Sequence, residues 1–167
     1  MNGGATFSAC GTYRYRLWRR WDPDARRCVF VGLNPSTADA ARDDPTIRKC
    51  IGFAARWGFG AIEVVNLFAY AGLRSTDPRS LLALADPVGP RNDAVLSGAL
   101  GGAGRIVWAW GRHDARVRAL VRTRVASAAW LSARHSCETG CLGRSSDGSP
   151  RHPLRIGYAT RFERGGP

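Results

Sequence analysis

Residues 29–39 read Val-Phe-Val-Gly-Leu-Asn-Pro-Ser-Thr-Ala-Asp, and this stretch sets the architecture of the chain. The run from Cys28 to Leu33 is almost entirely apolar, which is typical of a strand buried on both faces of a parallel sheet. The residues after it are ordinary turn residues. Because functional sites of open α/β sheets lie where strands end, we expect part of a site directly after Leu33.

Two further runs repeat this pattern. Ile62–Leu67 and Ile106–Trp110 are apolar, and polar or small residues lie within or directly after them. Helical patterns lie between the strands: an acidic pair before Pro45 predicts a helix to about Trp57, and Pro90 opens another to about Leu100. This alternation predicts one three-layer α/β/α, Rossmann-like domain with a mostly parallel central sheet.

The remaining elements are weaker predictions. Tyr13–Trp18 alternates as a half-exposed strand and is expected to form a hairpin with Cys28–Leu33. Other expected elements are a short helix starting at Asp77-Pro78, a basic helix over His113–Val125 and a short strand over Ala129–Leu131. The single domain spans residues 1–167 with a core over about 10–160. We expect disorder at the N-terminus and beyond about Arg161.

The charge of the chain favours a polyanionic partner. The 167 residues include 25 basic and 13 acidic ones, a formal net charge of +12, and Lys49 is the only lysine. Arginine matches phosphate geometry, so DNA or a nucleotide is the expected partner. A GC-rich genome would also explain the preference for arginine over lysine. No apolar stretch of about 20 residues and no signal-peptide core is present, so we expect a cytoplasmic monomer without membrane contact.

The cysteines predict neither a disulfide framework nor a metal site. Five cysteines are an odd number, and Cys28 and Cys50 lie in expected core positions. The cluster of His135, Cys137 and Cys141 lacks a Cys-x-x-Cys pair, which argues against zinc or an iron–sulfur cluster. We expect no cofactor.

Three side chains are candidates for chemistry. Asn34 follows the first buried strand and precedes a proline that stiffens the backbone. The alternative is that this segment is only a turn followed by a helix N-cap, since Asn, Pro, Ser and Thr are common there. Asn66 lies among apolar neighbours, where its amide either ties the sheet to a loop or reads a ligand edge. His152 lies between Pro150 and Pro153, which would hold a neutral imidazole in place; a surface-loop histidine is the alternative.

The order of these motifs resembles the uracil-DNA glycosylase superfamily. The matching segments are Gly32-Leu33-Asn34-Pro35, Val65-Asn66, Trp110-Gly111 and His152-Pro153. From Cys10 to about Tyr158 the pattern is still more similar to an uncharacterised bacterial family, domain-of-unknown-function family 1643. Leu154 departs from the glycosylase pattern, which has serine after His-Pro.

The glycosylase resemblance implies a role for each matching residue. Asn34 would position a water molecule, Asn66 would pair with the edge of an extruded base, and His152 would stabilise charge on the leaving base. Phe68 or Trp110 would stack on the base, although filling the core is the commoner role of tryptophan. Phosphates would be held by Ser36, Thr37, Gly111, Arg112 and Arg151.

We therefore expect a nucleobase-recognising protein, a DNA glycosylase-like hydrolase of N-glycosidic bonds. The alternatives are a non-catalytic nucleic-acid or nucleotide-binding module on the same fold, and a hydrolase of free nucleosides or nucleotides. An amide cannot act as a general base, so a reaction that relies on Asn34 should be slow. Asp39, Asp43 or Asp44 could supply the base instead, although helix capping is the expected role of Asp44.

Overall fold

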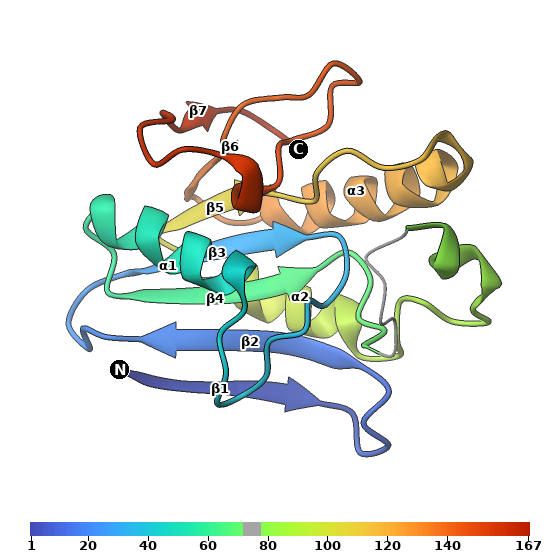
Figure 1. Ribbon diagram of the computed structural model, residues 1–167, viewed down its shortest axis with the longest axis horizontal. Helices are drawn as coiled ribbons and strands as arrows, with labels where there is room; N and C mark the ends of the chain where they lie inside the picture. The colour runs from blue at the N-terminus through green and yellow to red at the C-terminus, as the bar shows by residue number, and fades with distance from the viewer. Residues whose placement is uncertain (72–77) are drawn as a thin grey trace.

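The predicted buried strands form the centre of the sheet (Figure 1). The computed structural model describes residues 1–71 and 78–167. Strand β3 (Arg27–Gly32) lies between β4 (Ala61–Asn66) and β5 (Arg105–Trp108) and runs parallel to both, and β6 (Glu138–Cys141) runs parallel to β5. The strands predicted from hydrophobic pattern alone are therefore confirmed, whereas β6 was not predicted.

The edges of the sheet are antiparallel, so the prediction of a mostly parallel sheet is wrong there. Strand β2 (Arg14–Arg20) pairs with β4 and with β1 (Asn2–Phe7), and β7 (Glu163–Arg164) pairs with β6. The seven described strands have the order β1-β2-β4-β3-β5-β6-β7. The terminal segments expected to be disordered are instead the two edge strands.

The expected hairpin of β2 with β3 is also wrong, because β4 lies between them. Glu63 of β4 is buried and forms ion pairs with Arg16 Nε of β2 at 3.1 Å and with Arg27 Nη1 of β3 at 3.3 Å. A buried carboxylate needs such partners to offset its desolvation. Two arginines, one from each neighbouring strand, thus stabilise β4 in the position between them.

Helix α1 (Pro45–Arg56) covers one face of the sheet, as predicted. Asp44 caps the helix by accepting from Ile47 N at 2.9 Å, and Pro45 occupies the first turn, where no intrahelical donor is lost. The core on this side combines buried residues of the helix with one set of alternating strand side chains: Leu17, Cys28, Phe30, Ile47, Cys50, Phe53, Ile62, Val64 and Val107.

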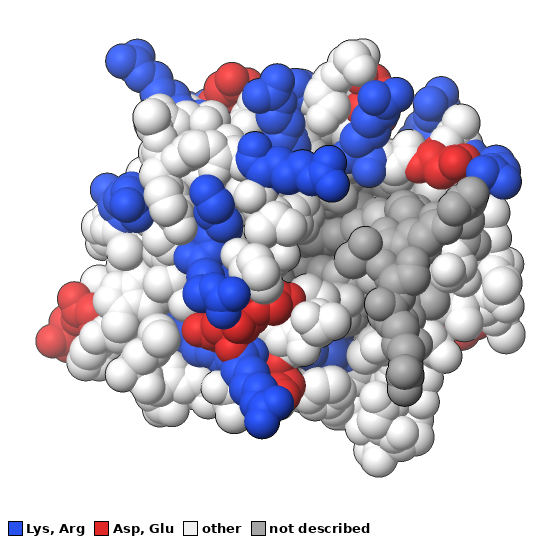
Figure 2. All heavy atoms as spheres, in the orientation of Figure 1, with Lys and Arg blue, Asp and Glu red and all other residues white. Residues whose placement is uncertain are grey.

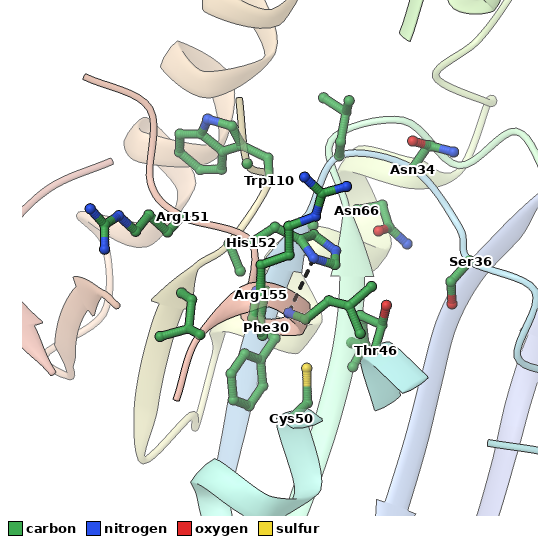
Figure 3. A pocket seen from close by; sticks show the side chains of 18 of the residues that line it. Phe30, Asn34, Ser36, Thr46, Cys50, Asn66, Trp110, Arg151, His152 and Arg155 are labelled. Atoms are coloured by element: carbon green, nitrogen blue, oxygen red, sulfur yellow. Dashed lines mark hydrogen bonds between the residues drawn. The ribbon is translucent and has the colours of Figure 1, made fainter. Parts of the chain in front are cut away.

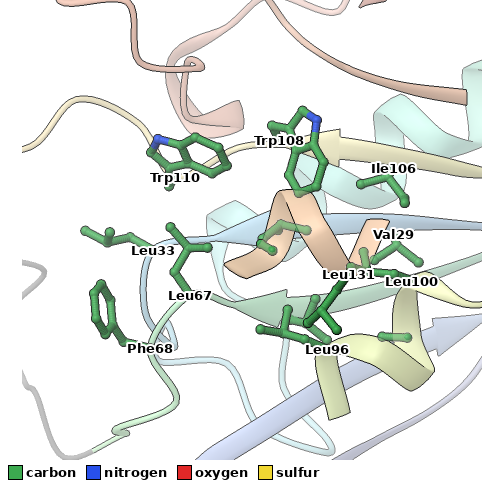
Figure 4. Close-up of a cluster of buried hydrophobic side chains, with 14 of the residues drawn as sticks. Val29, Leu33, Leu67, Phe68, Leu96, Leu100, Ile106, Trp108, Trp110 and Leu131 are labelled. Atoms are coloured by element: carbon green, nitrogen blue, oxygen red, sulfur yellow. The ribbon is translucent and has the colours of Figure 1, made fainter. Parts of the chain in front are cut away.

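Helices α2 (Asn92–Leu100) and α3 (Arg118–Ser132) cover the other face. They pack on the alternate strand side chains Val29, Val31, Val65, Ile106 and Trp108 (Figure 4). The short strand predicted over Ala129–Leu131 is wrong: Val121, Ala128 and Leu131 keep helical spacing and are buried together, and no glycine or proline interrupts α3. The short helix at Asp77-Pro78 corresponds to η1 (Pro78–Ala83), and Asp77 lies outside the described residues.

The basic helix predicted from His113 begins later in the structure. A single 3₁₀ turn, η2 (Ala115–Val117), capped by Asp114, precedes α3. Within the described part of the chain, none of the helices combines the length and the apolar composition needed to cross a bilayer.

The connections that follow the central strands lead to opposite faces of the sheet. The connection after β3 leads to α1 on one face, whereas the connection after β5 leads to α3 on the opposite face. Adjacent strands whose connections diverge in this way leave a crevice between them, which is where open α/β sheets bind ligands.

Candidate functional site

A cavity of about 570 Å³ opens at this point, within the range of about 300–1,000 Å³ found for small-molecule sites. Most of its wall comes from four segments that are distant in the sequence. They are the residues after β3, the end of β4, the residues after β5 and the loop that contains the 3₁₀ turn η3 (Pro153–Arg155): Gly32, Leu33, Asn34, Ser36, Asn66, Ala109, Trp110, Gly111, Arg112, Arg151, His152, Pro153, Leu154 and Arg155. The strand ends and the His-Pro loop therefore meet at one site.

Gly111 allows the His-Pro loop to approach the end of β5. Its N–H donates to Pro150 O at 2.9 Å, and its φ of +74° is one that residues with side chains rarely adopt. A Cβ atom at this position would lie 2.9 Å from Cβ of His152. Any larger residue would push the histidine away, so the Trp-Gly and His-Pro motifs form one structural unit.

The imidazole of His152 lines the cavity in its neutral form. Burial lowers the pKa of its ring below the usual 6.5; nearby Asp44 opposes this shift and Arg155 reinforces it. Nδ1 accepts a hydrogen bond from Leu154 N at 3.3 Å (dashed in Figure 3). With Nδ1 as the acceptor, the proton of the neutral ring is on Nε2. His152 therefore has one N–H donor left for a ligand.

Asn66 presents an amide that the fold does not satisfy. The residue is 3% exposed, and its Nδ2 has no hydrogen-bond partner among the described residues. Gly32, opposite it on β3, makes room for the amide, since a Cβ there would lie 2.7 Å from Asn66 Oδ1. A buried amide without partners is costly in a folded protein, so a ligand is the natural partner for this side chain.

Asn34 and Ser36 lie along one rim of the cavity, with Asn66 and His152 nearer its centre (Figure 3). The Asn34 amide makes one long hydrogen bond, from Nδ2 to Pro35 O at 3.4 Å. Ser36 contacts Arg14, whose Nη1 donates to Ser36 O at 3.0 Å. The rim thus keeps polar groups available on the side of the cavity that faces β2.

Several predicted residues contribute less than expected. Thr37 is exposed and does not line the cavity. Phe68 is fully buried in the core on the α2 and α3 side, so it does not face the cavity (Figure 4). Trp110 lines the cavity, but its ring packs on Trp108 at a centroid distance of 5.9 Å. Arg151 lines it with a guanidinium that extends away from the centre and donates to Arg144 O (Figure 3).

The charged side chains that line the cavity are all arginines: Arg14, Arg112, Arg151 and Arg155. Basic side chains also predominate over the upper half of the face in Figure 2. No carboxylate of the described residues lines the cavity. The charge of this site therefore favours an anionic ligand.

The three aspartates considered as alternative bases have structural roles. Asp39 accepts from the backbone N–H groups of Ala41 and Arg42, which lower its pKa. Asp43 forms an ion pair with Arg19 at 2.8 Å, and Asp44 caps α1. None of them belongs to the cavity wall.

Arg14 is a cavity residue that sequence reasoning missed. The alternation of Tyr13–Trp18 predicts a half-exposed strand, but Arg14 is only 2% exposed. Arg155 and Leu154 were also missed as lining residues, although they directly follow the predicted His-Pro motif. Proximity to a motif could have indicated these two, whereas the pattern contains no signal for Arg14.

The five cysteines are all free. Burial raises the pKa of Cys50, which lines the cavity, well above its usual value, so this thiol stays protonated at neutral pH. Among residues 1–71 and 78–167, no group of three or more His, Cys, Asp or Glu side chains is placed to hold a metal ion.

Comparison with known proteins gives one result. The model of the family described as Protein of unknown function (DUF1643) matches residues 14–154. This range runs from β2 through β6 and includes the His-Pro motif. No curated protein and no solved structure matches the chain. Since the match covers most of its 167 residues, the chain belongs to the DUF1643 family.

Proposed function

We propose that the protein binds a nucleobase in this cavity and hydrolyses the N-glycosidic bond that joins the base to its sugar. The observation that supports this most directly is the convergence of Asn34, Asn66 and His152 on one cavity from three separate segments. Asn66 offers an unsatisfied amide, and His152 offers an N–H donor. A pyrimidine edge presents both donors and acceptors, which an amide can pair with.

The reaction needs little beyond positioned polar groups. A water molecule held by Asn34 would form a bond from its oxygen to the anomeric carbon while the carbon–nitrogen bond breaks. The bonding electron pair leaves with the base, and the base then takes the proton that the water loses. Nε2–H of His152 would stabilise the negative charge that develops on the base. Fixed dipoles in a partly dry cavity stabilise such charge better than water does.

One observation favours a second candidate function. The described lining holds no carboxylate, and an asparagine cannot accept the proton of the attacking water. A protein that binds the same nucleobase without turnover is consistent with this lining. The two functions differ only in whether the glycosidic bond is cleaved, so a single assay separates them.

The test uses end-labelled single-stranded and duplex DNA that carries uracil, mismatched thymine or damaged bases, followed by alkaline cleavage at abasic sites. Free nucleosides and nucleotides are incubated in parallel and analysed for released base by chromatography. We expect slow base release from at least one substrate. Binding without released base from any substrate would support the second candidate, and the absence of binding would contradict both.

Variants then test the assignment of residues. His152→Ala and Asn34→Ala should each lower the rate by about 100- to 1,000-fold, as expected for the loss of a positioned group that acts on the transition state. His135→Ala is the matched control, since His135 lies between α3 and β6 and does not line the cavity. An activity that survives both cavity substitutions would place the reaction elsewhere.

A further inference from the structure

Arg14 is a buried cation in the cavity wall that the fold only partly satisfies. Its Nη1 donates to Ser36 O at 3.0 Å and also to Ala38 O, and its Nη2 reaches Ser36 Oγ at 3.5 Å. Nε has no partner among the described residues. A guanidinium has five N–H donors, so the edge formed by Nε and Nη2 retains capacity for another acceptor. This is an edge with which arginine binds two oxygens at once.

A β-bulge places Arg14 on the cavity side of the sheet. Thr6 of β1 is paired with Arg16, but the next residue, Phe7, is paired with Arg14, so Tyr15 is an extra residue in β2. Leu17 points toward the α1 side, and in a regular strand a residue three positions away would point to the opposite face. The bulge reverses this alternation and directs Arg14 toward Ser36.

A second arginine of β2 shows what a purely structural role requires. Arg19 is also buried, at 4% exposed, and like Arg14 it donates to backbone carbonyls of the loop between β3 and α1. Unlike Arg14, Arg19 has a carboxylate partner, Asp43, at 2.8 Å, and it does not line the cavity. The contrast shows that one buried arginine is neutralised within the fold, whereas the other faces the cavity.

Arg14 keeps its charge under ordinary conditions. Burial lowers the pKa of its guanidinium to about 10; the charge of Arg19 adds to this effect, whereas Asp44 and Asp39 offset part of it. No Asp or Glu of the described residues forms an ion pair with it, whereas Arg16 and Arg19 of the same strand both have one. A buried charge without a partner is strongly unfavourable, so an anion that enters the cavity would be stabilised there.

We infer that Arg14 and the Ser36 hydroxyl form a phosphate subsite of the cavity, so that the ligand is a nucleotide unit with its phosphate on the β2 side. This inference rests on the proposed function, which supplies the nucleoside part of the ligand. The phosphate can belong to a free nucleotide or to a single strand of nucleic acid. Both sources offer the same oxygens to the guanidinium edge and the hydroxyl.

The test compares ligands with and without the phosphate. The affinities of deoxyuridine, deoxyuridine 5′-monophosphate, a short oligodeoxyuridine and inorganic phosphate are measured by calorimetry on the full chain. We expect the phosphate to raise affinity at least about tenfold, as charge-assisted hydrogen bonds do. Arg14→Gln should remove this gain, and Arg14→Lys should remove most of it, because lysine lacks the planar fork. Arg19→Lys is the matched control and should retain it.

The outcomes separate this inference from the proposed function. If the gain is the same in wild-type protein and in folded Arg14 variants, or if no phosphate-containing probe binds, the subsite is overturned. Nucleoside binding that persists then leaves the proposed function intact. Inorganic phosphate that binds through Arg14, without any nucleoside affinity, would support the subsite and contradict the proposed function. Arg14-dependent binding of the oligonucleotide alone supports the subsite and identifies nucleic acid as the source.

Arg14 substitutions could also prevent folding, which circular dichroism would reveal. Ser36→Ala then provides the test, because Ser36 lies on a partly exposed loop and its hydroxyl has no role in a helix or strand. We expect this variant to fold and to lose a few-fold of the phosphate-dependent affinity, as expected for one hydrogen bond. An unchanged preference for the monophosphate over deoxyuridine would overturn the subsite.

Discussion

Two buried asparagines, Asn66 at the end of β4 and Asn92 at the start of α2, differ in how the fold uses them. Asn92 donates from Nδ2 to Asn66 O at 3.1 Å and to Leu67 O at 3.2 Å, and so ties α2 to the end of the strand. The side-chain nitrogen of Asn66 has no partner in the described part of the chain. We interpret Asn92 as a structural residue and Asn66 as a residue retained for a ligand.

Alanine substitutions test this difference at the residue scale. Asn92→Ala should lower the free energy of unfolding by about 1–3 kcal/mol, because Asn66 O and Leu67 O each lose one hydrogen bond, although Leu67 O keeps the one from Arg124 Nε. Asn66→Ala should leave stability unchanged or raise it, since it removes an unsatisfied buried amide, and should abolish nucleotide binding. Urea denaturation and calorimetry measure the two effects. A large loss of stability in Asn66→Ala would show that Asn66 is structural.

His152 should make stability depend on pH. Its pKa in the folded protein lies below the usual 6.5 because burial disfavours the charged ring. The unfolded chain therefore takes up a proton at higher pH than the folded protein. The contribution of His152 to stability is complete above about pH 7 and is lost as the pH falls through 6.5 toward the folded-state pKa.

The matching measurement compares the Tm of the wild-type protein with that of His152→Gln, which cannot titrate. Between about pH 7 and about pH 5, the Tm of the wild type should fall further than that of the variant. Other groups titrate in both proteins and cancel in the comparison. Equal falls in Tm would mean that the ring is not held in its neutral form.

At the scale of elements, hydrophobic pattern was sufficient for β3, β4 and β5, and a helix-start signal was sufficient for α1. The three strands are buried on both faces, and the helix has an acid before proline at its start. Strands β1 and β6 were missed for physical reasons. β1 begins Asn-Gly-Gly and β6 contains Glu and Gly, residues with low strand propensity, and both are held by pairing with a neighbouring strand instead.

The candidate site was predictable to the extent that it follows strand ends. Asn34 and Asn66 could be found because parallel strands bring their carboxyl ends to one edge. Arg14 could not, because the bulge at Tyr15 reverses the alternation on which the strand prediction relies. The prediction for Phe68 relied on its closeness to Asn66 in the sequence. The structure buries Phe68 in the core on the α2 and α3 side of the sheet, away from the cavity.

The junction between β5 and the His-Pro loop gives a prediction at this scale. Gly111 and Gly102 have nearly equal φ values of +74° and +70°, but only a Cβ at Gly111 would meet His152, whereas one at Gly102 would meet nothing within 4 Å. Alanine at either position should cost about 1–2 kcal/mol of backbone strain.

Only Gly111→Ala should also displace His152 and weaken nucleotide binding. Denaturation gives the stability of each variant, and calorimetry gives its affinity. Because Gly102→Ala has the same strain without the collision, it serves as the control. If both variants bind nucleotide as well as the wild type, the contact between the two motifs does not position the histidine.

At the scale of the whole molecule, the formal charge of +12 has two possible consequences. It can attract a polyanion to the entire surface, or the arginines at the cavity can make specific phosphate contacts. The exposed arginines Arg112, Arg151 and Arg155 surround the cavity, whereas Arg118, Arg122 and Arg134 are exposed on and just after α3 and do not line it. Replacing either set by glutamine lowers the net charge equally.

The salt dependence of binding distinguishes the two consequences. For a single-stranded oligonucleotide, the logarithm of the association constant falls with the logarithm of salt concentration by about 0.7 per phosphate contact. The cavity triple variant should therefore reduce this slope by about 2, and the α3 triple variant should leave it nearly unchanged. Fluorescence anisotropy titrations from low to moderate salt provide the slopes. Equal reductions in both variants would mean that net charge attracts the strand, and that the arginines around the cavity make no phosphate contacts of their own.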